Sequence, residues 1–84
     1  MERFTYQTKG VCSRNIDITV DQGIVINVEY HGGCSGNTQG VAALVKGMKI
    51  EEAIERLGGI RCGFKSTSCP DQLATALNEY LNKN

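Results

Sequence analysis

Four cysteines are the residues of this sequence with the most recognisable chemistry. They are Cys12, Cys34, Cys62 and Cys69 of an 84-residue chain, and each lies outside the apolar stripes of the sequence. A lone cysteine is usually a small buried apolar residue, whereas a thiolate is a nucleophile and a ligand for metal ions. Because all four avoid the apolar positions, we expect them to share one metal site, with Zn(II) as the first choice of ion.

The surroundings of these cysteines favour metal binding over other thiol chemistry. No C-x-x-C pair is present, which argues against zinc-ribbon and thioredoxin-like motifs. Cys34 and Cys69 each precede a predicted helix, whose first N–H groups favour the thiolate. His31 is the only histidine, and it competes with Cys62 as the fourth ligand. A hydrogen-bonded histidine at the end of a strand is the commoner role for such a residue.

Alternating apolar and polar residues predict three strands in the first part of the chain, around residues 3–8, 16–20 and 24–30. Asp21-Gln22-Gly23 is expected to form a three-residue hairpin loop, with Val20 opposite Ile24. In that register Ile18 faces Ile26, Ile16 faces Val28, and Cys12 lies opposite Gly32, with Cys34 just beyond the same edge. The hairpin therefore predicts that two of the cysteines meet at one end of a sheet.

The second part of the chain has the period of a helix. Three apolar stripes are expected to face the core: Val41, Leu44, Val45 and Met48; Ile50, Ala53, Ile54 and Leu57; and Leu73, Leu77, Tyr80 and Leu81. Gly47 and Gly58-Gly59 end the first two helices, Lys49 is a poor N-cap for the second, and Pro70 suits the first turn of the third. The sequence predicts one domain over residues 1–84, an α+β fold with a three-stranded antiparallel sheet followed by about three helices on one face.

Composition excludes several classes of function. Nine basic and nine acidic residues balance, and the basic residues are scattered, so nucleic acid is not an expected partner. No long apolar run predicts a membrane span, and the first residues have no signal-peptide pattern, so we expect a cytoplasmic protein. In that reducing compartment, cysteines bind metal more often than they form lasting disulfides.

The string Thr67-Ser68-Cys69-Pro70-Asp71 resembles the signature of the TSCPD domain. That domain occurs at the C-terminus of adenosylcobalamin-dependent (class II) ribonucleotide reductases and as short stand-alone proteins with four cysteines. The resemblance extends over nearly the whole chain and includes Gly33-Cys34-Ser35-Gly36 and Val45-Lys46-Gly47. It implies a metal site and a ribonucleotide reductase as partner in DNA precursor synthesis, but no activity of the chain by itself.

The order of elements also resembles iron–sulfur cluster scaffolds of the IscU and NifU type. Cys12, Cys34 and Cys69 match the three scaffold cysteines. The sequence departs from the scaffolds at Arg14, where they have Asp, and at Ser68, where they have His. An iron–sulfur cluster is therefore the alternative to zinc that the second resemblance implies, with Cys62 in place of the missing histidine. No Ser-His-Asp or P-loop spacing appears, so we expect neither catalytic residues nor an organic cofactor.

Overall fold

The computed structural model describes residues 1–11, 13–32, 35–61 and 66–83. Three strands come first and three helices follow, as the sequence predicts. They are β1 (Glu2–Gln7), β2 (Ser13–Asp21), β3 (Ile24–Gly32), α1 (Ser35–Val45), α2 (Ile50–Leu57) and α3 (Cys69–Lys83). The α+β prediction is therefore confirmed.

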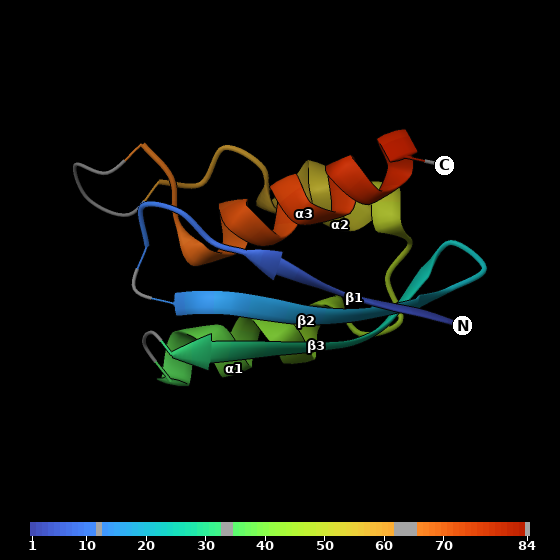
Figure 1. The fold of residues 1–84 in the computed structure, drawn as a ribbon, viewed down its shortest axis with the longest axis horizontal. Helices are drawn as coiled ribbons and strands as arrows, with labels where there is room; N and C mark the ends of the chain where they lie inside the picture. The colour runs from blue at the N-terminus through green and yellow to red at the C-terminus, as the bar shows by residue number, and fades with distance from the viewer. Residues whose placement is uncertain (12, 33–34, 62–65, 84) are drawn as a thin grey trace.

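The strands form one antiparallel sheet in the order β1-β2-β3, and the three helices lie behind one face of it (Figure 1). Helix α1 packs on β3, and α2 packs on α3. Between sheet and helices lies the apolar core, whose largest fully buried side chains are Ile16, Ile18, Ile50, Leu73, Leu77, Val20, Val25 and Val45. Polar residues occupy the other side of the central strand, which we call the open face.

The hairpin between β2 and β3 is tighter than predicted. Asp21 pairs directly with Ile24, which leaves only Gln22 and Gly23 in the loop, at φ 51° and 80°. Two consecutive left-handed residues are typical of a type I′ turn, whose twist matches that of the strands. The predicted three-residue loop and the pairing of Val20 with Ile24 are therefore wrong.

An irregularity between Thr19 and Val20 then shifts the register again. Val20 pairs with Val25, whereas Ile18 pairs with Val28 and not with Ile26. Val25 is consequently buried, and Ile26 is 37% exposed. A period-2 pattern cannot reveal such a bulge, because Ile26 is as apolar as the residue that replaces it in the core.

A second irregularity lies at the start of β2, where Ser13 pairs with Gly32 and Asn15 with His31. Arg14 is therefore the extra residue of a β-bulge. In a regular strand Ser13 would share the open face with Asn15, because side chains alternate. The bulge breaks this alternation, so that Ser13 is 4% exposed on the helix side while Arg14 is exposed.

The helices follow the predicted stripes with one exception. Ile50, Ala53, Leu73 and Leu77 are buried, as expected, but Leu44 is 75% exposed on α1 and does not belong to the core. Lys49 makes no side-chain cap hydrogen bond at the start of α2, in agreement with its weakness as an N-cap. Within the described residues, no helix combines the length and the apolar character needed to cross a membrane.

Candidate functional site

Cys69 is the one predicted ligand within the described part of the chain; Cys12, Cys34 and Cys62 lie outside the described residues. Cys69 is the first residue of α3, and its free thiol is buried. Its Sγ lies 3.3 Å from the hydroxyl oxygen of Ser13, a distance at which either group can donate a hydrogen bond. The contact therefore joins the start of α3 to the start of β2.

Residues that lie close to Cys12 and Cys34 in the sequence are also found near Cys69. Ser13 directly follows Cys12 and pairs with Gly32, which only Gly33 separates from Cys34. Strand β2 begins, β3 ends and α3 begins at the same end of the molecule, on the left of Figure 1. The bulge at Arg14 is what turns Ser13 toward Cys69, so the local irregularity of β2 contributes directly to the site.

Ser68 anchors the segment that precedes Cys69. Its hydroxyl accepts a hydrogen bond from the N–H of Asp71 at 3.2 Å, which makes Ser68 the N-cap of α3. The same hydroxyl donates to the carbonyl oxygen of Ile60 at 2.6 Å. Ile60 lies two residues before Cys62 in the sequence, so this bond joins the residue next to Cys69 to the start of the segment that carries Cys62.

The carboxylate of Asp71 makes two further hydrogen bonds to the segment between α2 and α3. One oxygen accepts a hydrogen bond from the N–H of Gly59 at 2.7 Å, and the other accepts from the hydroxyl of Thr67. A carboxylate in the first turn of α3 also interacts favourably with the helix dipole. Asp71 therefore holds both ends of the segment between α2 and α3.

Replacing Ser68 by Ala removes both of its hydrogen bonds at once. We expect the change to lower the free energy of unfolding by about 1–2 kcal/mol, because an N-cap is lost and the Ile60 carbonyl loses its partner. Ser68→Thr keeps the hydroxyl and is the matched control. Chemical denaturation measures both variants; equal stability of Ser68→Ala and the unsubstituted chain would contradict the assigned role.

Gln72 connects the start of α3 to the segment between β1 and β2. Its side-chain oxygen accepts a hydrogen bond from the N–H of Lys9, and its side-chain nitrogen donates to Thr67, both at 3.0 Å. In the same segment the Thr8 hydroxyl donates to the carbonyl oxygen of Ser13. These bonds fix the residues on both sides of Cys12 relative to Cys69.

Tyr30 completes the buried surroundings of Cys69. Its hydroxyl donates a hydrogen bond to the carbonyl oxygen of Cys69 at 2.9 Å. Burial, with the negative charge of Cys69 as a second cause, raises the pKa of the Tyr30 phenol well above its ordinary value. Tyr30 therefore stays neutral and acts as a positioning donor for the first turn of α3.

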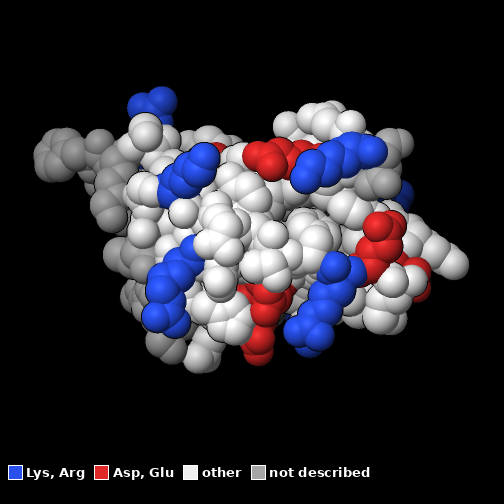
Figure 2. Space-filling view, in the orientation of Figure 1, with Lys and Arg blue, Asp and Glu red and all other residues white. Residues whose placement is uncertain are grey.

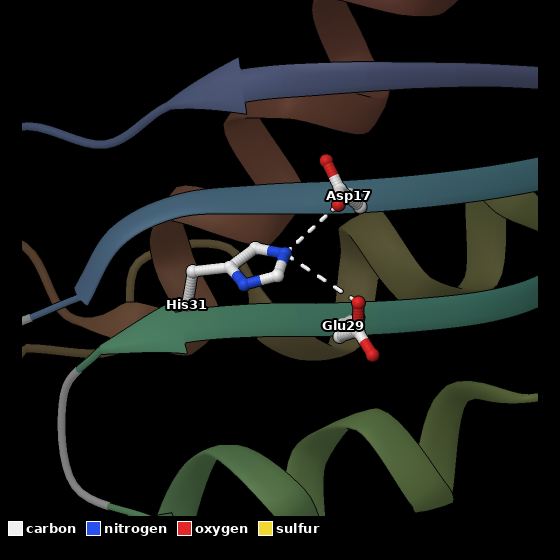
Figure 3. Close-up of side chains that lie close together, drawn as sticks. All are labelled: Asp17, Glu29 and His31. Atoms are coloured by element: carbon white, nitrogen blue, oxygen red, sulfur yellow. Dashed lines mark hydrogen bonds and ion pairs between the residues drawn. The ribbon is translucent and has the colours of Figure 1, made fainter.

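His31 lies in a different cluster, on the open face (Figure 3). Its Nε2 is 2.8 Å from Asp17 Oδ2 and 3.5 Å from Glu29 Oε1. The Thr5 hydroxyl, followed by the His31 ring, lowers the pKa of the Asp17 carboxyl below its ordinary value. The prediction of a hydrogen-bonded histidine at a strand end is confirmed. Asp17 and Glu29 were missed, because the predicted register placed Asp17 opposite Asn27 instead of Glu29.

Comparison with known proteins identifies a family for the chain. A family model described as the TSCPD domain matches residues 2–81. No curated protein matches the chain, and no solved structure matches it. The likeness to IscU and NifU scaffolds therefore stays a prediction from the sequence.

Proposed function

Because this chain belongs to the TSCPD domain family, we propose that it is a small metal-binding protein of the cytoplasm. Cys12, Cys34, Cys62 and Cys69 would together hold one Zn(II). The observation that carries the proposal is the contact between Ser13 and Cys69, whose Oγ and Sγ atoms are 3.3 Å apart. Through the peptide bond between Cys12 and Ser13, this contact connects two of the proposed ligands.

The other two cysteines are connected to this contact by described residues. Consecutive Cα atoms are about 3.8 Å apart, which limits how far Cys34 can lie from Gly32, the partner of Ser13 in the sheet. The hydrogen bond from Ser68 to Ile60 limits the reach of Cys62 in the same way. Four ligands from segments far apart in the sequence can therefore meet at one point.

The donor set fits Zn(II) in a structural role. Zinc accepts four thiolates in a tetrahedral arrangement with Zn–S distances of about 2.3 Å, and such a site leaves no position for a substrate. When bound, the ion would contribute folding free energy, which suits a short chain with a small core. Ser13 would support the site as a hydroxyl donor to sulfur, in the way that outer partners orient metal ligands.

The proposal is tested by the metal content of the full chain, purified without chelators under reducing conditions. We expect one zinc per chain by elemental analysis, and thiols that react with a thiol reagent only after the metal is removed. A folded chain without metal, whose four thiols react freely, would contradict the proposal.

An iron–sulfur scaffold is the second candidate function, supported by the match of Cys12, Cys34 and Cys69 to scaffold cysteines. Anaerobic reconstitution with iron and sulfide distinguishes the two. A stable visible absorption band that zinc does not prevent would favour the cluster, whereas a colourless product that holds only zinc would favour the structural site. The proposed protein partner is a ribonucleotide reductase, and co-purification of the two chains tests it separately.

A further inference from the structure

We propose that the open face of the sheet carries a second metal site, in which Asp17, Glu29 and His31 bind one divalent first-row metal ion. The site uses none of the cysteines and therefore does not depend on the function proposed above. The ion would be of the class that combines imidazole with carboxylate oxygen, such as Mn(II), Co(II) or Zn(II).

The register of the sheet brings the three side chains together. Asp17 pairs with Glu29, and Asn15 pairs with His31, so these four residues form two adjacent rows on one face. Figure 3 shows the ring of His31 directed toward Asp17 and Glu29, across the two strands. Paired strands such as β2 and β3 position ligands better than loops do.

The distances suit a metal ion with little movement of the side chains. One ligand atom from each of the three residues lies within 4.8 Å of the other two. The separations from His31 Nε2 are 2.8 Å to Asp17 and 3.5 Å to Glu29. Two ligands that are each about 2.0–2.2 Å from one ion lie about 3–3.5 Å apart, so the observed spacing is close to that of a coordinated set.

Asn15 adds a polar side chain beside the cluster in the register of the sheet, opposite His31 and two residues before Asp17 on the same face. The residue is partly exposed, but its side-chain oxygen is buried and has no hydrogen-bond partner among the described residues. A buried acceptor without a donor is unfavourable. A water bound to an ion at the neighbouring cluster would offer this oxygen a donor.

The three side chains are accessible to solvent, and their negative charge favours a bound cation. Exposed fractions are 39% for His31, 23% for Asp17 and 60% for Glu29, so solvent can complete the coordination. Thr5 donates a hydrogen bond to the second oxygen of Asp17 at 2.6 Å, which orients this carboxylate. Figure 2 shows Lys and Arg side chains spread around this face, with acidic groups between them. The two carboxylates supply two negative charges, which a divalent ion neutralises.

The test uses Mn(II), a paramagnetic ion that prefers oxygen and nitrogen to sulfur. The full chain is first given one equivalent of Zn(II), which the four proposed thiolates bind in preference to an oxygen-rich site, and unbound ion is removed. The Mn(II)-to-protein ratio is then raised while amide and histidine ring NMR signals are followed. We expect broadening centred on residues 15–17 and 29–31 and on the ring of His31. Because His31 is the only histidine, its ring signals need no assignment.

Asp17→Asn and His31→Gln should each weaken Mn(II) binding by more than about tenfold, because each removes a direct ligand. Glu29→Gln is the second variant if either of these fails to fold, since the Glu29 side chain is mostly exposed. Glu52→Gln, which removes a carboxylate paired with Arg56 on α2, is the matched control. No broadening, broadening centred elsewhere, or equal binding by the variants would overturn the proposal and leave a plain ion pair.

Discussion

Replacing Cys69 by Ser is expected to remove most of the bound zinc and much of the stability of the fold. Loss of one thiolate from a four-thiolate site should weaken zinc binding by more than about a hundredfold, which corresponds to about 2.8 kcal/mol. In a domain of this size, such a loss lowers the melting temperature by about 10–20 °C. Zinc per chain and thermal unfolding by circular dichroism measure the two effects.

Ser13→Ala is the matched control for this experiment. It leaves all four proposed ligands in place and removes only the hydroxyl that lies against Cys69 Sγ. We expect zinc to be retained and bound about tenfold more weakly, as for the loss of an outer partner. If Cys69→Ser kept a full complement of zinc and its melting temperature, Cys69 would not be a ligand and the proposed site would fail.

Replacing Leu73 by Ala should destabilise the chain by about 2–5 kcal/mol. Leu73 is completely buried between α3 and the sheet, and truncation there leaves a cavity that the thin core cannot refill. A chain of this length has about 4–12 kcal/mol of stability in total, so the variant would lose a large share of its free energy of unfolding. Urea denaturation in saturating Zn(II) measures the difference in free energy of unfolding between Leu73→Ala and the unsubstituted chain at the same metal content.

Leu44→Ala supplies the same chemical change at an exposed position of α1. Leu44 is 75% exposed, so its truncation should change the free energy of unfolding by less than about 0.5 kcal/mol. Similar losses for the two variants would mean that Leu44 is covered in solution, and that the assignment of the core to the inner faces of α1 and α3 is incomplete.

The architecture could be predicted from the sequence because the two-residue alternation of the strands and the helical period of the second half are both strong. Alternation in β2 and the helical stripes of α2 and α3 each select one type of element and one buried face. Leu44 shows where this reasoning stops: it fits the stripe of α1, but a short helix against the edge of a small sheet has only part of that stripe in contact with the core.

The register could not be predicted in the same way. The turn at Gln22-Gly23 and the two irregularities in the pairing of β2 with β3 each shift the register by one residue, and an apolar pattern rich in Ile and Val fits several registers equally well. The cluster of Asp17, Glu29 and His31 depends on that register, so it became visible only in the folded chain. Convergence of the segments around Ser13, Gly32 and Cys69 was predicted, although from a pairing scheme that is wrong in detail.

The bulge at Arg14 lets β2 carry one extra residue without changing the face on which Ser13 lies. Deleting Arg14 would place Ser13 directly before Asn15, and regular alternation would then keep Ser13 on the helix side, opposite Gly32 and against the sulfur it touches. A regular strand of unchanged length would instead pair Arg14 with Gly32 and turn Ser13 to the open face. Surface segments generally accept insertions and deletions with little harm, and natural variants that lack the residue at position 14 are therefore expected.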